Sequence, residues 1–473
     1  MHIVFLNPQG NFDAKDSYLT EHPDFGGQLV YVKEVAQALV DLGHKVDIVT
    51  RRIRDAAWPE FAEDQGSYPD YEENLRILRF PCGGDRFLEK EQLWPHLPAF
   101  IASMLEFYGD ALPDFATAHY ADGGYCAVLT QARTGMPFTF TGHSLGAQKL
   151  EKLGTTIANW SNMEARYLFS RRIAAERMSM AHAARIIVST GQEQKEQYAH
   201  ALYAGAVDPA DDRHFAVTPP GVNERVFSFE STDLDAEVTA ALDSRFGEDV
   251  GPCTVVSSRL DEKKNILGVV KAYAGNAALR ERAALVLCVR GLDDPDKDIA
   301  KLGGAEQTVL REILDVIDAA GMRERVYFLN IGSQLELAAT YRYFARRGSV
   351  FALTSFYEPF GLAPIEAAAT GLAPVATNNG GPTEIFADGS GVLVDPFSAE
   401  EIADGLLDGL SRHAALSKAA IKRVQETYTW RQTAEGYLAV IDANRSDTNN
   451  KAIAQPRELD EAERILGFLK SLE

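Results

Sequence analysis

Short apolar strands alternate with amphipathic helices along most of this chain, and this alternation most constrains the fold. Residues 2–6 form an apolar run, residues 28–42 carry apolar side chains at helical spacing, and residues 45–50 form a second apolar run. A strand, helix and strand in this order predict a parallel βαβ unit. The same order starts again at residue 253, with further strands expected at 284–289, 325–329, 349–354, 373–377 and 391–395. The chain is therefore predicted to be an α/β protein with two doubly wound parallel sheets.

The length of 473 residues exceeds what one hydrophobic core usually supports, so two domains are expected. Thr218-Pro-Pro-Gly-Val-Asn223 has the composition of a linker. We place the first domain at residues 1–217 and the second at 218–427, and we expect the helices of about 428–473 to pack back onto the first domain. A polar stretch at 444–451 precedes a final helix near 460–472. Two facing sheets of this type enclose a cleft at the carboxyl ends of their strands.

The net charge is −21 and no long basic block is present, which argues against nucleic acid or a membrane as the main partner. The amino-terminal residues lack the features of a signal peptide, and no apolar run is long enough to cross a membrane, so we expect a soluble cytoplasmic protein. Four cysteines (Cys82, Cys126, Cys253 and Cys288) are widely spaced in mostly strand-like apolar runs. They are expected to be reduced core thiols, without disulfides or structural zinc.

Two glutamates, Glu358 and Glu366, flank a tight turn that follows an apolar strand and opens a helix. The turn contains Phe360, Gly361 and Leu362. A helix start offers free N–H groups and a positive dipole end, which suit a diphosphate. One carboxylate can accept from hydroxyls of a sugar and the other from a ribose. This stretch predicts a sugar-nucleotide site.

A glycine pair, Gly26-Gly27, precedes Gln28 at the start of the first helix and allows close approach of an anionic ligand. A simple turn explains the pair equally well. The full Gly-x-Gly-x-x-Gly pattern is absent here, which disfavours a nicotinamide dehydrogenase.

The stretch Gly142-His-Ser-Leu-Gly146 follows a strand and matches the nucleophile elbow of serine hydrolases, with Ser144 as nucleophile. An acid and a later histidine would be needed, and none stands in an evident strand-end loop of the same domain. This alternative also leaves the second domain and the glutamate pair unexplained. We favour the interpretation in which His143 points into the site.

Cations at strand ends can bind an anionic ligand. Arg259 and Lys264 follow the first strand of the second domain, where they can stabilise a leaving diphosphate. Lys149 and the pair Arg171-Arg172 lie in the first domain. The acidic loop at 293–298 lacks an ordered ligand spacing, so no metal site is expected.

Together these residues resemble one family over nearly the whole chain, the retaining glycosyltransferases of family 4 with the GT-B fold, and within them the sucrose-phosphate synthases. The resemblance is carried by five motifs: residues 7–12, 22–33 and 139–149, Arg259 with Lys264, and the Glu358 to Glu366 stretch. It implies two facing Rossmann-like domains. It also implies transfer of glucose from UDP-glucose, or ADP-glucose, to fructose 6-phosphate, which gives sucrose 6-phosphate with retention.

The resemblance also assigns roles to individual residues. It implies catalytic roles for His143, Glu358, Arg259 and Lys264, and donor binding by Gly27, Arg259, Lys264, Glu358, Phe360, Gly361, Leu362 and Glu366. Acceptor binding is implied for Gly27, Gln28, Lys90, Tyr120, Ser144, Lys149, Arg171 and Arg172. No metal or other cofactor is expected, because cations and a helix start take the place of a divalent ion.

Several alternatives remain open at this stage. A sucrose synthase that uses free fructose and a transferase that uses GDP-mannose both have similar motifs. A serine hydrolase that uses Ser144 and a sugar-nucleotide sensor without activity are more remote. The chain differs from plant relatives in having no long extension at its start and no phosphatase domain at its end, so a separate sucrose-phosphate phosphatase is the expected downstream partner.

Overall fold

The computed structural model describes residues 1–18, 22, 24–247, 250–446 and 458–472, and it divides the chain into two compact units. The first unit comprises Met1–Pro219 and Thr433–Glu473, and the second comprises Pro220–Gln432. The expected boundaries, 217/218 and 427/428, thus lie two and five residues before the observed divisions. Part of the polar connection expected at 444–451, residues 447–451, lies outside the described residues.

The first unit contains a sheet in the order β3-β4-β2-β1-β5-β6-β7-β8. All neighbouring strands in it are parallel except the short edge strand β3, which runs antiparallel to β4. The strands are β1 His2–Leu6, β2 Lys45–Arg51, β3 Gln65–Gly66, β4 Leu75–Phe80, β5 Phe115–His119, β6 Phe138–Thr141, β7 Arg185–Val188 and β8 Phe215–Val217. Its longer helices are α1 Gly27–Asp41, α2 Leu97–Tyr108, α3 Tyr120–Thr134, α4 Gly146–Lys152, α5 Trp160–Tyr167, α6 Phe169–His182, α17 Trp430–Asn444 and α18 Glu458–Ser471.

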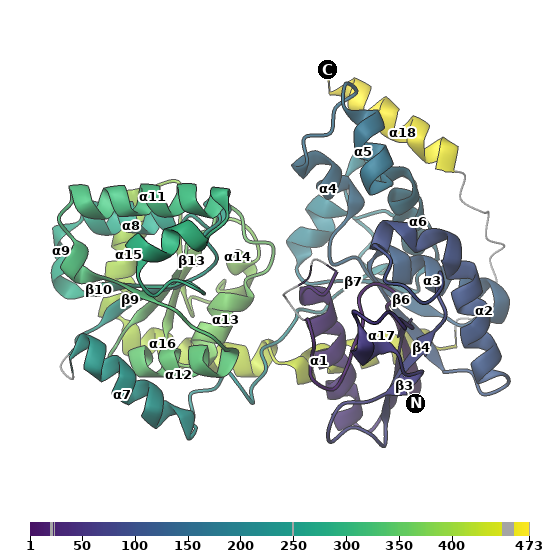
Figure 1. The fold of residues 1–473 in the computed structure, drawn as a ribbon, viewed down its shortest axis with the longest axis horizontal. Coiled ribbons are helices and arrows are strands. Elements are labelled where there is room, and N and C mark those ends of the chain that lie inside the picture. The colour runs from purple at the N-terminus through teal and green to yellow at the C-terminus, as the bar shows by residue number, and fades with distance from the viewer. Residues whose placement is uncertain (19–21, 23, 248–249, 447–457, 473) are drawn as a thin grey trace. The chain divides into compact units, whose positions relative to one another are not determined.

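Both faces of this sheet are covered, because successive side chains of β1 point to opposite faces and nearly all of them are apolar and buried. Val4 and Leu6 pack into a core shared with α2, α3 and α6, and α18 packs against α6 (Figure 1). On the other face, the Phe5 ring stacks on His119 at 5.3 Å between centroids. The Tyr31 ring of α1 and the Tyr437 ring of α17 lie beside the same histidine. Both α1 and α17 therefore cover this second face.

The second unit is a parallel sheet in the order β11-β10-β9-β12-β13-β14. Its strands are β9 Cys253–Ser257, β10 Ala284–Cys288, β11 Val326–Leu329, β12 Val350–Leu353, β13 Ala373–Thr377 and β14 Val392–Val394. Helices α8 Ile266–Gly275, α11 Gly304–Ala319 and α15 Ala399–Ser411 cover one face; α7 Leu234–Phe246, α12 Gln334–Ala345, α13 Leu362–Ala369 and α16 His413–Thr427 cover the other (Figure 1). Shorter helices are α9 Ala277–Arg282, α10 Pro295–Asp298 and α14 Pro382–Ile385.

Numbered by their order in the chain, the six strands of the second sheet lie as 3-2-1-4-5-6, which is the Rossmann order. The strand order reverses between β9 and β12. In the first sheet the equivalent reversal lies between β1 and β5. Ligands of such sheets bind beyond the carboxyl ends of the strands at this point. The loops after β9, β12, β1 and β5 are therefore the places to look for a site in each unit.

The cysteines are all free and buried. Cys253 and Cys288 lie in β9 and β10, as expected, whereas Cys126 lies in helix α3 and Cys82 follows strand β4. Short apolar runs do not distinguish a buried strand from a buried helix, which explains the difference for Cys126. Among the described residues, no helix is both long and apolar enough to cross a bilayer.

Candidate active site

The second unit brings together Lys264 and Glu358 at the reversal point of its sheet. The Lys264 ammonium, in the loop after β9, donates to Glu358 Oε2 in the loop after β12 at 2.7 Å. The Ser355 hydroxyl donates to the same oxygen at 3.2 Å. The two charged residues are 94 positions apart in sequence. Parallel pairing of β9 with β12 places their following loops side by side, which explains the contact.

The loop around Glu358 is held by the loop that follows β13. The Glu358 amide donates to the Asn379 carbonyl at 3.1 Å, and the Gly381 amide donates to the Glu358 carbonyl at 2.8 Å. Gly380 has a φ of +109°, and a Cβ there would lie 2.1 Å from the Glu358 carbonyl oxygen. Only glycine fits this position, so the residue is required for the shape of the loop.

The helix after this loop presents the other half of the predicted donor site. Helix α13 begins at Leu362, directly after Gly361, whose φ of +115° favours glycine. Leu362 is exposed and Phe360 is buried. Glu366 lies one turn into α13, and burial raises its pKa to about 7. Its carboxyl group therefore changes charge near neutral pH.

Arg259, which also follows β9, lines a pocket to which neither Lys264 nor Glu358 contributes. Arg259 is exposed, and the pocket of about 570 Å³ is also lined by residues of α11, among them Glu306 and Glu312. The expected pairing of Arg259 with Lys264 on one diphosphate therefore stays a prediction, while the Lys264 to Glu358 pair is present.

In the first unit, Gly27 is the first residue of α1 and is exposed. A Cβ at Gly26 or Gly27 would meet no atom within 4 Å, so the space over this helix start is open. The Gln28 amide reaches back to Asn7 Oδ1 at 2.5 Å, which ties the helix start to the loop after β1. This places Gly27 and Gln28 at the reversal point of the first sheet.

A cluster of charged side chains lies near the start of α3. Arg172 of α6 is buried, with its guanidinium 4.5 Å from the Tyr120 ring centroid. It donates to Glu176 Oε1 at 2.9 Å and to the Ser144 carbonyl at 2.5 Å. Glu176 also accepts from the Gly146 amide at 2.9 Å and from the Tyr203 hydroxyl. Arg172 and Glu176 therefore shape the turn that contains His143 and Ser144.

Two lysines belong to the same cluster. Lys90, in the short helix Lys90–Gln92, pairs with buried Asp24 at 3.0 Å. Lys149 in α4 lies 3.8 Å from Glu91, a long and weak pairing. Burial and the neighbouring charges of Arg172 and Lys90 lower the pKa of Lys149 to about 8. Each cation of the cluster already lies beside a carboxylate, so a phosphate bound here would replace at least one of these partners.

Asp122 in the first turn of α3 is the buried acid of this cluster. Its Oδ2 atom is buried and has no hydrogen-bond partner within the described residues. Burial, assisted by Glu91 and opposed by Arg172, raises its pKa to about 7. The sequence motifs did not select Asp122, because an isolated aspartate at a helix start is usually structural.

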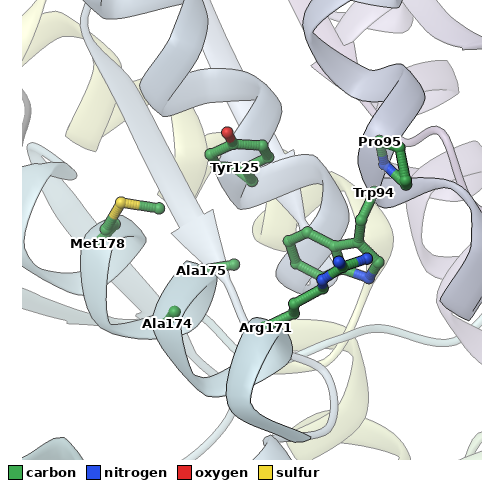
Figure 2. A pocket seen from close by; sticks show the side chains of 7 residues that line it. All are labelled: Trp94, Pro95, Tyr125, Arg171, Ala174, Ala175 and Met178. Carbon is green, nitrogen blue, oxygen red and sulfur yellow. The ribbon is translucent and has the colours of Figure 1, made fainter. Parts of the chain in front are cut away.

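Arg171 points to a different place from Arg172. It lines an apolar pocket of about 140 Å³ with Trp94, Pro95, Tyr125, Ala174, Ala175 and Met178. Figure 2 shows Arg171, Ala174, Ala175 and Met178 along one side of α6, with Tyr125 and Trp94 supplied by other elements. The side chains of adjacent helical residues point about 100° apart. Adjacency in the sequence therefore does not place Arg171 and Arg172 at the same ligand.

His143 follows strand β6 and has a left-handed backbone, with a φ of +55°. Its Nε2 atom lies 2.9 Å from Nδ1 of His119, a residue that the motifs did not select. His119 lies at the end of strand β5, directly before helix α3. This position at a strand end is the signal that could have identified it from the sequence.

Ser144 is exposed, and its hydroxyl accepts from Arg172 at 3.3 Å. A guanidinium cannot take the proton of a nucleophile, so this serine is not activated as in a hydrolase. The match to a nucleophile elbow is explained by the turn that Glu176 and Arg172 hold.

Two facts about fold and sequence define the class. The two doubly wound parallel sheets form the GT-B architecture, and residues 26–209 match the family model described as Glycosyl transferase 4-like domain. Residues 247–426 match the family described as Glycosyl transferases group 1. The chain is a glycosyltransferase.

A probable sucrose-phosphate synthase from Thermosipho melanesiensis is 43% identical over 444 residues, which cover 93% of this chain and 96% of that protein. The chain belongs to the sucrose-phosphate synthase family. Longer plant relatives also match, and the chain spans about half of their length, between 47% and 49%.

Solved structures agree on the fold. The sucrose-phosphate synthase of Thermosynechococcus elongatus has a TM-score of 0.64 and 22% identity, and the match covers 94% of this chain and 98% of that one. The Anabaena protein HepE in complex with UDP has a TM-score of 0.62 and 15% identity, and it covers 94% and 100% respectively.

Proposed function

We propose that this enzyme transfers glucose from UDP-glucose, or from ADP-glucose, to fructose 6-phosphate with retention at the anomeric carbon, to give sucrose 6-phosphate. The observation that carries the proposal is the cluster of Lys90, Lys149 and Arg172 in the first unit. Each of these cations has a carboxylate partner, but the Lys149 to Glu91 pair is long at 3.8 Å, so Lys149 is the cation that an acceptor phosphate can most readily engage. Free fructose brings no charge to it.

On the donor side we assign Lys264 and Arg259 to the diphosphate, with the start of α13 contributing backbone donors. Glu358 would accept from hydroxyls of the glucosyl group and Glu366 from hydroxyls of the ribose. HepE, a structural neighbour, was crystallised with UDP-glucose, which supports a nucleotide sugar as donor. The contact between Lys264 and Glu358 supports a site in which a bound sugar nucleotide replaces this ion pair. Its diphosphate would then contact Lys264, and its sugar hydroxyls would donate to Glu358.

Retention is accounted for without a protein nucleophile. The acceptor hydroxyl attacks from the face that the diphosphate leaves, and a phosphate oxygen of the leaving group takes the hydroxyl proton. The contribution of the protein is orientation and stabilisation of the growing negative charge on the diphosphate. We assign the second of these tasks to Lys264. We further propose that activity does not depend on a divalent metal.

We also propose a downstream partner enzyme and a cellular compartment. Release of free sucrose from sucrose 6-phosphate requires hydrolysis of the phosphate ester, so a separate phosphatase is the proposed downstream partner. We propose the cytoplasm as the compartment, in accord with four buried free thiols.

The test is release of the nucleoside diphosphate from the donor, UDP-glucose first, by the purified protein in the presence of a chelator. Fructose 6-phosphate and fructose are compared as acceptors, and ADP-glucose and GDP-mannose are compared as donors. UDP formed only with fructose 6-phosphate supports the proposal and its metal independence. Equal or better turnover of fructose assigns sucrose synthase activity instead, and a preference for GDP-mannose reassigns the donor.

A further inference from the structure

His119 is a fully buried histidine whose two ring nitrogens both have partners. It ends strand β5, and its Nε2 atom lies 3.0 Å from the Thr117 hydroxyl two residues earlier. Its Nδ1 atom lies 2.9 Å from Nε2 of His143. The three side chains thus form a chain of hydrogen bonds that leads from the sheet to the turn after β6.

Both histidines are neutral near pH 7. Burial lowers the pKa of His119 well below its ordinary value, with His143 contributing, and burial lowers the pKa of His143 to about 3. A neutral imidazole carries one N–H and one bare nitrogen. Only one hydrogen therefore lies between His119 and His143, and its owner decides what His143 offers to a ligand.

The Thr117 hydroxyl decides this question. It is buried, and in the part of the chain that the structure describes its only recorded polar partner is His119 Nε2. If it accepted from His119, its own hydrogen would have no acceptor, and a buried donor without a partner is costly. Thr117 therefore donates to Nε2, and His119 must carry its hydrogen on Nδ1.

The same reasoning continues to His143. His119 Nδ1–H donates to His143 Nε2, so the hydrogen of His143 lies on Nδ1. Within the described residues no hydrogen-bond partner of His143 Nδ1 is recorded. The Tyr31 ring packs against the imidazole in a T-shaped arrangement, with centroids 4.9 Å apart, and restrains the His143 ring. His143 consequently presents one unpaired N–H donor.

We propose that His119, oriented by Thr117, is a positioning residue that holds His143 in its Nδ1–H tautomer, so that His143 donates a hydrogen bond to a sugar hydroxyl instead of accepting one. The identity of this ligand rests on the proposed function. The tautomer itself does not, since it is a property of the protein without substrate.

The direct test is the tautomer in the whole, ligand-free protein. Histidine is labelled with ¹⁵N, and multiple-bond ¹H–¹⁵N correlations distinguish Nδ1–H from Nε2–H; variants with single histidines replaced assign the signals. We expect the Nδ1–H pattern for both His119 and His143 between pH 6 and pH 8. An Nε2–H pattern at His143 overturns the proposal, whether or not the protein transfers glucose.

Substitutions at Thr117 link the tautomer to turnover. Thr117→Val removes the hydroxyl and should lower kcat about three- to tenfold, the worth of one hydrogen bond, with His143 no longer in a single tautomer. Thr117→Ser restores the hydroxyl and should recover both. The matched control is Thr139→Val, which changes the cross-strand neighbour in β6, whose buried hydroxyl has no recorded partner.

Similar kcat and spectra for Thr117→Val and Thr139→Val would overturn the proposal, since loss of a buried hydroxyl would then be harmless wherever it lies. His119→Phe keeps a ring against Phe5 but removes the donor, and it should match Thr117→Val or be worse. If no glucose transfer is detected in any variant, the proposed function fails while the spectra still test the tautomer.

Discussion

The Lys264 ammonium lies 2.7 Å from a Glu358 carboxylate oxygen, across the point at which the strand order of the second sheet reverses. Both side chains are mostly buried, with exposed fractions of 28% and 12%. Each therefore neutralises the other while no ligand is bound. A sugar nucleotide with a negative diphosphate and hydroxyl donors can replace both halves of the pair at once.

Replacement of Lys264 should reduce turnover far more than stability. For Lys264→Ala we expect kcat to fall by about 10² to 10³, because a fixed cation no longer faces the leaving diphosphate. Initial rates of UDP release measure this. Lys263→Ala is the control: its exposed side chain is removed, while its carbonyl still accepts from the Phe356 amide at 3.0 Å. Equal losses in the two variants would remove Lys264 from the donor site.

Donor binding should depend on pH through Glu366. Burial raises the pKa of this group to about 7, so it is mostly neutral at pH 6 and mostly ionised at pH 8. An ionised carboxylate accepts stronger hydrogen bonds from ribose hydroxyls. The affinity for UDP, measured by calorimetry, should therefore rise from pH 6 to pH 8. Glu366→Gln should lose this rise, and Glu281→Gln, at an exposed position in α9, should keep it.

Acceptor binding should weaken at alkaline pH through Lys149. Its pKa is lowered to about 8, so the positive charge is present below that pH and lost above it. The KM for fructose 6-phosphate should rise as the pH passes from 7.5 to 9. Lys149→Arg keeps its charge throughout this range, so its KM should stay nearly constant. Lys152→Arg, an exposed change at the end of the same helix, should retain the rise of the unmodified enzyme.

Asp122 should make the folded state less stable as pH increases. Its pKa is raised from 3.8 in a model peptide to about 7 in the fold. Between these values the unfolded chain has released the proton and the folded chain still holds it, so the free energy of unfolding falls as pH rises. The loss is nearly complete at pH 8 and is on the order of 4 kcal/mol. Asp122→Asn should therefore raise Tm at pH 8 but change it little at pH 4.

Asp47 provides the opposite control. Burial acts to raise its pKa, but hydrogen bonds from His2, Arg76 and Tyr108 outweigh this and lower the pKa to about 2. Its stabilisation is therefore present above pH 4 and lost as pH falls towards 2. Asp47→Asn should lower Tm at pH 8, where Asp122→Asn raises it. Shifts of the same sign in the two variants would contradict these assignments.

Local features of the site were predictable because they depend on short stretches of sequence. The apolar run before Glu358 predicted strand β12, and Gly361 marked the turn before helix α13. The alternation of strands and helices starts again at residue 253, and this pattern predicted the second sheet. Such patterns reflect side-chain spacing along one element, so a single sequence carries them.

The tertiary structure alone decided which strand ends meet. Parallel pairing of β9 with β12 brings Lys264 to Glu358, while Arg259 lines a pocket with α11. The order of strands in a sheet follows from packing between distant segments, which no local spacing records. The direction of a side chain is equally hidden, as Arg171 and Arg172 show by lining different places.

The sequence by itself determined the class of fold, the position of the candidate donor loop and the family, because these rest on local periodicity and on motifs. Only the tertiary structure decided the partner of His143 and the burial that shifts the pKa of Glu366 and Asp122. Both depend on what surrounds a side chain in three dimensions. A buried charge loses hydration only after distant segments have closed around it, and that free-energy cost cannot be assigned to any one stretch of sequence.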